Sequence, residues 1–215
     1  MGKCVLVYGK SGSGKSRSLK NFGEDEIFLV QTIDKDLPFR KKFRYQMQTD
    51  SIATITNGLS KMPVKVAVID DAGYLMTNAF MRGHSAPKKG SSSFDLYNDI
   101  ADSFWGLLMA ISRLPRDVIV YVIMHEQTND YGDTKLRTIG KLLDEKVCVE
   151  GMVTVALRCM AADGRHFFRT QSDGNDISKS PEGMLPLEME NDLKAVDTAI
   201  REYYDLGGDN NETVQ

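Results

Sequence analysis

The sequence predicts an α/β fold in which helices flank a mostly parallel central sheet. Two observations favour this class. Short apolar runs typical of buried strands alternate with helical segments along the 215 residues, and several of these runs end directly in a glycine-rich loop or a polar residue. We expect residues 1–206 to form a single domain and residues 207–215 to form a polar C-terminal tail.

A phosphate-binding motif follows the first predicted strand. After the apolar residues 5–8, residues 9–16 read G-K-S-G-S-G-K-S and match the P-loop pattern G-x-x-x-x-G-K-[ST]. Backbone N–H groups of such a loop point at phosphate oxygens, and a helix over residues 16–22 would add partial positive charge. Lys15 would reach the β- and γ-phosphates, and the Ser16 hydroxyl would ligate Mg²⁺. The alternative is a simple turn between strand and helix. The residues expected to bind nucleotide are Gly9, Lys10, Ser11, Gly12, Ser13, Gly14, Lys15, Ser16 and Arg17.

The second predicted strand, residues 26–32, leads into a basic segment. Aromatic residues alternate with cations over residues 39–45, so this segment could hold a nucleic-acid backbone while its rings stack on bases. The alternative is a solvated loop whose aromatic side chains pack inward. The cations concerned are Arg40, Lys41, Lys42 and Arg44. A short helix is expected over residues 51–62, before Pro63.

A second chemical motif is the apolar strand over residues 64–71, which reads V-K-V-A-V-I-D-D and ends in acids, as a Walker B strand does. The carboxyl ends of parallel strands meet at the edge where ligands bind, so Asp70 would hold Mg²⁺ through water beside the P-loop. Residues 82–93 have the composition of a mobile loop, and we interpret Lys88 and Lys89 within it as surface residues.

The next segments predict a long amphipathic helix over residues 94–114 and a third buried strand over residues 117–124. The strand delivers His125 to the same edge of the sheet, where a polar residue can contact the γ-phosphate. The alternative is a histidine ring that hydrogen-bonds a loop carbonyl. The helix residues expected in the core are Tyr97, Ala101, Phe104, Trp105, Leu108 and Ile111.

The C-terminal third predicts a β-hairpin and a closing helix. Residues 128–146 suggest a mobile loop, and residues 147–160 and 164–171 suggest two strands joined by an Asp-Gly turn. A glycine-rich turn region over residues 172–183 precedes the helix over residues 187–204. The apolar face of that helix carries Leu193, Val196, Ile200 and Tyr203.

The P-loop, the Walker B strand and a polar tip on an intervening strand indicate a nucleoside-triphosphate hydrolase or a P-loop kinase. The sequence contains no [NT]-K-x-D element for guanine, which favours ATP. Hydrolysis requires a residue that polarises the attacking water. Asp71, Asp34 and Glu126 are the candidates; the sequence does not decide among them, and we lean towards Asp71, which adjoins the Walker B acid.

Composition and charge limit the other classes of protein. A net charge of −3 means that nucleic acid could bind only at local basic patches. The longest apolar run, residues 118–124, is far shorter than a membrane span. Because the P-loop strand begins almost at residue 1, we expect no signal peptide. We interpret Cys4, Cys148 and Cys159 as reduced core residues of a cytoplasmic protein.

The order of motifs resembles a family of bacteriophage AAA-type ATP-binding proteins, which look like truncated RecA cores and are related to phage single-strand-annealing ATPases. The resemblance covers nearly residues 2–205 and rests on the P-loop and on later motifs that are specific to the phage group. These motifs are I-D-D-A-G-Y-L, V-Y-V-I-M-H-E, T-I-G-K-L-L-D-E-K, T-Q-S-D-G, K-S-P-E-G-M and N-D-L-K-A-V-D-T-A-I-R-E-Y-Y.

The resemblance implies a RecA-like core that assembles as a ring or filament, with ATP at the interfaces between subunits. It implies that Lys179 completes the neighbour's site, with Arg169 as a weaker candidate, because a cation supplied in trans stabilises charge on the transferring phosphoryl group. It also places DNA contacts in the loop after the third strand, at Lys135, Arg137 and Lys141. The chain is shorter than full recombinases and does not clearly reproduce their catalytic glutamate, so slow or DNA-stimulated hydrolysis is expected.

The expected function is a phage-encoded, RecA-like ATPase that binds Mg-ATP and single-stranded DNA and assists recombination, annealing or replication. One alternative is an ATP-dependent interaction module, such as a helicase loader or a partner of a single-strand-binding protein. A further alternative is a nucleotide kinase that uses Arg40 and Arg44 in a lid.

Overall fold

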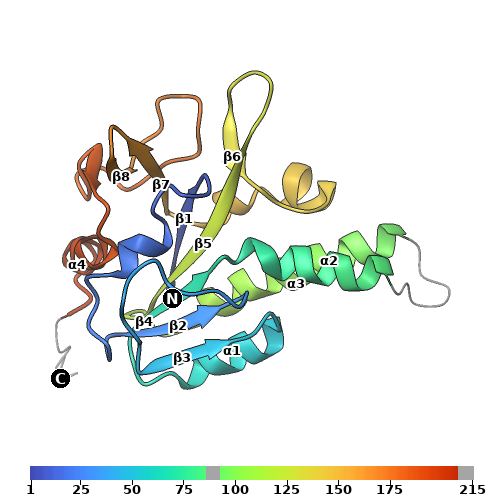
Figure 1. Cartoon of the computed structure of the whole chain (residues 1–215), viewed down its shortest axis with the longest axis horizontal. Helices are drawn as coiled ribbons and strands as arrows, with labels where there is room; N and C mark the ends of the chain where they lie inside the picture. Colours follow the sequence, from blue (N-terminus) through green and yellow to red (C-terminus); the bar gives the residue numbers. More distant parts are fainter. Residues whose placement is uncertain (86–92, 208–215) are drawn as a thin grey trace, which may run out of the picture.

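The computed structural model describes residues 1–85 and 93–207 and has a mixed sheet at its centre (Figure 1). The order of the strands is β3-β2-β4-β5-β1-β7-β8-β9, and β6 pairs with β5 outside this row. The six strands from β3 to β7 run parallel, whereas β8, β9 and β6 are antiparallel to their neighbours. The predicted α/β class with a mostly parallel sheet and a C-terminal hairpin is therefore confirmed. The strands are β1 (Lys3–Gly9), β2 (Ile27–Gln31), β3 (Tyr45–Gln48), β4 (Val66–Asp70), β5 (Ile119–Thr128), β6 (Thr134–Leu136), β7 (Val155–Ala162), β8 (Arg165–Arg169) and β9 (Glu188–Glu190).

Helices cover both faces of the sheet, and alternate residues of each parallel strand face opposite layers. On β1, Leu6 and Tyr8 pack in the layer of α1, α2 and α3, whereas Val5 and Val7 pack in the layer of η1 and α4. This alternation follows from the two-residue period of a strand, and burial on both faces explains why the strands read as continuous apolar runs. The helices are α1 (Ile52–Lys61), α2 (Gly73–Ser85), α3 (Ser93–Ser112) and α4 (Leu193–Tyr203), with the short turns η1 (Ser16–Leu19), η2 (Leu142–Val147, a π-helix) and η3 (Val149–Met152).

The strand order places the three predicted motifs side by side. Strand β5 lies between β1 and β4, as the sequence predicts for the intervening strand, and Gly9 at the end of β1 pairs with His125 on β5. The carboxyl ends of these parallel strands therefore present the P-loop, Asp70 and His125 at one edge of the sheet.

Several element boundaries differ from the sequence expectation in the first half of the chain. The helix after the P-loop is a single 3-10 turn, η1, and does not extend to Phe22. Helix α2 was not predicted, and residues 82–85, expected in a loop, form its last turn. Burial of Leu75 and Met76 in the core stabilises α2. The apolar pattern of this segment in the sequence is too weak to predict the helix. Residues 86–92, with Lys88 and Lys89, lie outside the described residues, as does most of the expected tail, residues 208–215.

The C-terminal half differs in a similar way. Strand β5 continues to Thr128 because β6, placed where a loop was expected, pairs with it from Glu126 onward. The first hairpin strand begins at Val155 rather than at residue 147, because η2 and η3 occupy the preceding residues. The unpredicted strand β9 delays α4 to Leu193, where the Asp192 side chain caps the helix by accepting from two backbone N–H groups.

Three residues expected in the core are instead exposed. Trp105 is 45% exposed although its neighbour Phe104 is fully buried, and Tyr203 is 47% exposed at the end of α4. Cys148 is exposed with a left-handed backbone between η2 and η3, whereas Cys159 is buried; the cysteines are free thiols. Helical spacing assigns Trp105 and Tyr203 to an apolar face, but it does not give the width of the buried stripe. That width depends on which elements pack against the helix.

Within the part of the chain that the structure describes, none of the helices has the length and apolar character that a membrane crossing needs.

The adjacent residues Phe104 and Trp105 test this packing. We expect Phe104→Ala to lower the free energy of unfolding by about 3–5 kcal/mol, because it opens a cavity in the core. Trp105→Ala should cost less than about 1.5 kcal/mol, since nearly half of the side chain already faces water. Urea unfolding of the two variants measures both values, and equal losses would contradict the exposure of Trp105.

Candidate phosphate and metal site

The P-loop closes around the ammonium group of Lys15. Lys15 Nζ donates hydrogen bonds to the backbone oxygens of Gly9 at 3.0 Å and Lys10 at 2.8 Å, and the residue is only 6% exposed. Burial lowers the pKa of Lys15, and the nearby Asp71 carboxylate opposes that shift. The loop thus holds a cation in a fixed place between its own carbonyls and the open pocket.

Close approaches explain two of the glycines in this loop. A Cβ on Gly9 would lie 2.4 Å from the backbone oxygen of Cys159, and a Cβ on Gly14 would lie 2.8 Å from Nδ1 of His166. Gly14 also has a φ of 100°, in the left-handed region that favours glycine. The hairpin β7–β8 therefore packs directly against the loop, and a side chain at either position would push them apart.

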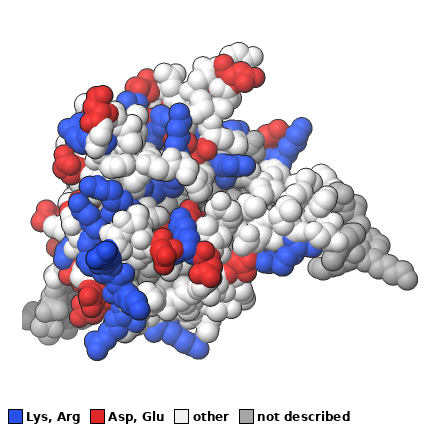
Figure 2. Space-filling model, in the orientation of Figure 1, with Lys and Arg blue, Asp and Glu red and all other residues white. Residues whose placement is uncertain are grey.

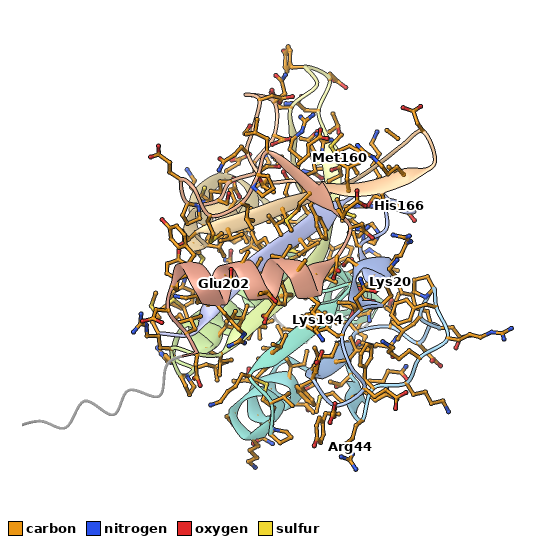
Figure 3. All side chains as sticks on the ribbon, turned by 90° about the vertical axis from the view of Figure 1, so that its left-hand side faces the viewer. Lys20, Arg44, Met160, His166, Lys194 and Glu202 are labelled. Carbon is orange, nitrogen blue, oxygen red and sulfur yellow. The ribbon has the colours of Figure 1, made fainter. Side chains whose placement is uncertain are left out.

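The hairpin and β9 also bond to the loop. The backbone oxygen of Ser13 is 2.8 Å from Nδ1 of His166 and accepts from the Cys159 thiol at 3.1 Å. Figure 3 shows His166 on the hairpin beside the loop, with α4 running across the face in view from Lys194 towards Glu202. Arg17, expected to contact nucleotide, donates to the side chain of Asn191 at 3.2 Å.

Ser16 and Asp70 form a pair that suits a hard divalent cation. The Ser16 hydroxyl donates to Asp70 Oδ1 at 3.0 Å, and Asp70 is 1% exposed at the end of β4. The second carboxylate oxygen, Oδ2, is buried without a hydrogen-bond partner. Burial, and next the charge of Asp71, raises the pKa of Asp70. Hydroxyl and carboxylate oxygens are the ligands that Mg²⁺ prefers, so these residues fit that ion.

Asp71 is the other acid at this edge, and it contacts two further site residues. It is 2% exposed, and a φ of 57° turns the chain from β4 into α2. One carboxylate oxygen accepts a hydrogen bond from the Lys35 ammonium, and the other lies 3.9 Å from His125 Nδ1. Burial and the charge of Lys15 lower the pKa of His125, so its ring is neutral at pH 7. The ring packs edge-on against Tyr74, with 6.1 Å between centroids.

These groups line one open cavity of about 330 Å³. It brings together the predicted residues Lys15, Ser16, Asp71 and His125, while Asp34 is exposed and lies outside the lining. The chain after β2 instead directs Lys35 and Asp36 into the cavity, residues that no sequence motif marks for this role. The cavity is lined by Ser11, Gly12, Gly14, Lys15, Ser16, Arg17, Lys35, Asp36, Pro38, Asp71, His125 and His166.

Glu126, the third acid considered for activating water, is held in an ion network behind the site. Arg158 donates to both of its carboxylate oxygens, at 2.9 and 3.0 Å, and to Asp176 at 3.3 Å. The side chains of Glu126 and Asp176 are 3% and 0% exposed, so Glu126 depends on this guanidinium for its charge balance, and Asp176 shares it with Arg169. Glu126 therefore joins β5 to β7 and to the segment before Lys179.

The two cations considered for a role in trans lie elsewhere. The backbone of Lys179 pairs with that of Ala156 on β7. Lys179 is half-buried and does not line the cavity formed by the P-loop of its own chain. Arg169 is committed within the chain, because its guanidinium forms ion pairs with Asp173 at 2.5 Å and Asp176 at 3.6 Å.

The basic segment after β2 presents cations rather than rings. Arg40, Lys42 and Arg44 are exposed, and Lys and Arg side chains form a band on the left-hand part of the face in Figure 2. Phe43 is 3% exposed within the core, which is the inward packing that the sequence left as the alternative to base stacking. Lys41 donates to the backbone oxygens of Lys20 and Phe22, both at 2.6 Å.

The second group of cations follows β5. Lys135 lies on β6, and Arg137 and Lys141 are exposed beyond it. The backbone N–H of Arg137 donates to the backbone oxygen of His125 at 2.9 Å. This surface is therefore connected directly to a residue that lines the phosphate cavity.

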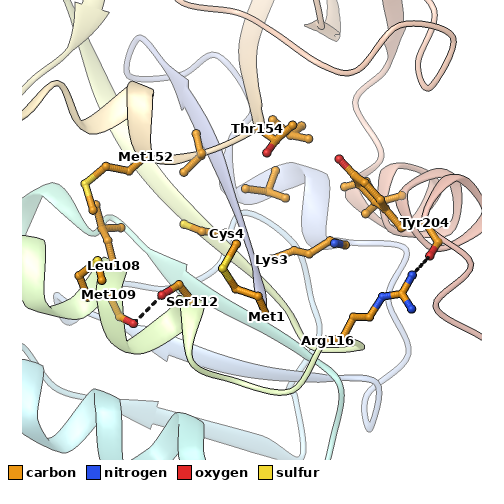
Figure 4. Close-up of a pocket in the computed structure, with 15 residues that line it drawn as sticks. Met1, Lys3, Cys4, Leu108, Met109, Ser112, Arg116, Met152, Thr154 and Tyr204 are labelled. Atoms are coloured by element: carbon orange, nitrogen blue, oxygen red, sulfur yellow. Dashed lines mark hydrogen bonds between the residues drawn. The ribbon is translucent and has the colours of Figure 1, made fainter.

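A separate cavity of about 300 Å³ lies at the opposite ends of the strands (Figure 4). Its lining includes the starts of β1 and β7, Lys3 and Arg116, and none of the residues of the phosphate cavity. Lys3 lies over the ring of Tyr204, with 3.8 Å from its nitrogen to the centroid.

A P-loop after β1, an acid at the end of β4 and a strand between them define the core of a P-loop nucleoside triphosphatase. The chain belongs to the family of AAA domains, whose model matches residues 1–181. Among solved structures, it is similar to the P4 protein from bacteriophage phi6 in complex with ADP, at 20% identity and a TM-score of 0.42. That similarity covers 78% of this chain and 56% of the P4 chain. No curated protein matches the chain.

The ion network behind the site predicts a large difference between two arginines. We expect Arg158→Met to lower the free energy of unfolding by about 3–5 kcal/mol, because it leaves Glu126 buried without its cation and leaves Asp176 with Arg169 at 3.6 Å. The control is Arg165→Met, whose ion pair with Glu188 spans 3.8 Å on the surface and should be worth less than about 1 kcal/mol. Denaturant unfolding measures both free energies. Similar losses for the two variants would contradict a role of Arg158 in neutralising buried carboxylates.

Asp70 predicts opposite effects on stability and on metal binding. An acid whose pKa is raised by folding loses stability as pH rises from its ordinary value of 3.8 through the raised value. Asp70→Asn should therefore make the nucleotide-free protein more stable at pH 7 and flatten this part of its stability profile. The same variant should lose Mg²⁺-dependent nucleotide binding. Unfolding at several pH values and titration with nucleotide measure both effects; a less stable variant at pH 7 would contradict the cost assigned to the buried charge.

Proposed function

We propose that this chain is a RecA-like ATPase that binds Mg-ATP in the phosphate cavity and hydrolyses it. One observation carries the proposal. Across residues 1–85 and 93–207, the buried side-chain oxygens without a hydrogen-bond partner are Ser13 Oγ, in the P-loop, and Asp70 Oδ2, on the acid that accepts from Ser16. Unpaired buried polar atoms are costly, and a metal ion held by Ser16 and Asp70 would supply the missing partner of Asp70 Oδ2. Membership in the AAA domain family supports the same conclusion.

In this mechanism Lys15 binds the β- and γ-phosphates from the base of the cavity. Ser16 and Asp70 would hold Mg²⁺, which when bound offsets negative charge on the phosphates. Asp71 accepts a proton from the attacking water. At the same time the water oxygen bonds to the γ-phosphorus, and the bond between the γ-phosphorus and the leaving oxygen of ADP breaks. Neutral His125 donates or accepts a hydrogen bond at the terminal phosphate without adding charge.

We further propose that single-stranded DNA binds to the surface that contains Arg137 and Lys141. Exposed cations can neutralise DNA phosphates, and the bond between Arg137 N–H and the His125 oxygen links this surface to the phosphate cavity. Loss of the terminal phosphate at His125 would then alter the position of the DNA-binding residues. Lys135 and the basic residues Arg40, Lys41, Lys42 and Arg44 belong to the wider proposed contact area; Lys41 would first have to leave its carbonyl partners.

The proposal also includes assembly of subunits into a ring or filament, with Lys179 completing the site of the neighbouring subunit. Lys179 supports this role by lying outside its own cavity. The cellular role that fits best is assistance of phage DNA recombination, annealing or replication in the host cytoplasm. A module that binds ATP and a protein partner with little turnover is the second candidate, since Glu126 and Asp34 are both placed away from the reaction.

ATP turnover with and without single-stranded DNA tests the proposal. We expect slow hydrolysis that DNA accelerates, and we expect Lys15→Ala to lower turnover by about 10²- to 10³-fold, since it removes a charged donor from the phosphates. Combined Arg137→Ala and Lys141→Ala should abolish the acceleration while leaving the basal rate within about twofold, because these residues lie outside the cavity.

Each other outcome has a defined meaning. ATP binding that is indifferent to Lys15→Ala would contradict the nucleotide site. Tight ATP binding without DNA-dependent turnover would favour the interaction module, and transfer of the γ-phosphate to a nucleoside monophosphate would favour a kinase.

A further inference from the structure

Lys35 is a cation that the fold brings to the mouth of the phosphate cavity. The loop after β2 is fixed at its start, because the Thr32 hydroxyl donates to the backbone oxygens of Asp71 at 2.7 Å and Asp70 at 3.1 Å. The Gln31 side chain donates to the backbone oxygen of Lys35 at 2.9 Å. These bonds hold the Lys35 backbone beside the ends of β2 and β4, and its side chain, 39% exposed, lines the cavity.

In the structure the Lys35 ammonium is paired with Asp71. Burial by itself would lower the pKa of Lys35, and the hydrogen bond to Asp71, with the charges of Asp70 and Asp71, outweighs that effect and raises it. Lys35 is therefore charged at neutral pH. With Lys15, it offsets the negative charges of Asp70 and Asp71.

We propose that Lys35 binds the γ-phosphate of ATP and that this contact releases Asp71 to accept the proton of the attacking water. The inference rests on the proposed function of the same cavity. Lys35 then acts as a switch within one subunit: with ADP or no nucleotide it occupies Asp71, and with ATP it moves to the additional phosphate charge.

Lys35 suits this role better than the other cations of the cavity. Lys15 donates to the carbonyls of Gly9 and Lys10 rather than to Asp71, and Arg17 donates to Asn191, so neither would release Asp71 by moving towards a phosphate. The Lys35 ammonium is bonded to Asp71, and its flexible four-carbon stem can carry the ammonium a short way into the cavity. The dianionic terminal phosphate attracts an ammonium more strongly than one carboxylate does.

The affinities for ADP and for a non-hydrolysable ATP analogue with an imido bridge, both with Mg²⁺, test the inference. We expect Lys35→Ala to weaken binding of the analogue by about tenfold or more and to change binding of ADP by less than about threefold, because only the analogue carries the γ-phosphate. Lys61→Ala, an exposed lysine in the last turn of α1, is the matched control and should change neither affinity.

A second variant separates this role from simple stabilisation of Asp71. Lys35→Ala leaves the buried Asp71 carboxylate without its lysine partner, so the variant unfolds more easily; Lys35→Ala with Asp71→Asn removes both charges and should restore stability. We expect the double variant to retain the loss of preference for the analogue over ADP. If Lys35→Ala or the double variant keeps the wild-type preference, the inference is overturned while the nucleotide site stands. If the wild-type protein binds neither nucleotide, the proposed function fails, and the inference fails with it.

Discussion

The buried carboxylate of Asp70 is the constraint on which the rest of the site depends. A charged group shielded from water raises the free energy of the folded protein unless partners compensate for it. Ser16 supplies one hydrogen bond at 3.0 Å, while the second oxygen remains unpaired at 1% exposure of the residue. The cost is high at this position because Asp70 ends β4, an inner strand of the sheet. The other residues of β4, 66–69, are apolar and buried. Stability has been given up at one position where a cation can later bind.

Charge balance around this carboxylate explains the arrangement of its neighbours. Asp71 is nearly as buried and adds a second negative charge, which Lys35 neutralises from the loop after β2. Lys15 contributes a positive charge from the P-loop, and its effect with that of burial keeps His125 neutral. The charges of these groups therefore compensate one another, and the entry of a phosphate would disturb the whole set at once.

The phosphate loop is supported from an unexpected side. The helix behind it is only one turn, η1, so it cannot act as the long rigid helix that such loops commonly precede. The hairpin β7–β8 and the residue after β9 take over this support, since Cys159, His166 and Asn191 bond to the loop or to one another. Arg158 on the same hairpin binds Glu126, the residue after His125. A segment that reads as a separate C-terminal hairpin is thus part of the phosphate site.

The sequence by itself determined the features that depend on short-range patterns. Apolar runs defined the parallel strands, the glycines defined the loop after β1, and the acid at the end of a run placed Asp70 at the edge where ligands bind. These features are local, because a strand period, a left-handed φ or a strand end requires only neighbouring residues. Only the tertiary structure decided that Lys35 and not Asp34 enters the cavity, that Glu126 is neutralised by Arg158, and that Phe43 packs inward. Each of these outcomes depends on a contact between residues that are far apart in the sequence. Arg158 and Glu126 are separated by 32 positions, and Lys35 and Asp71 by 36. No local pattern encodes such a partner.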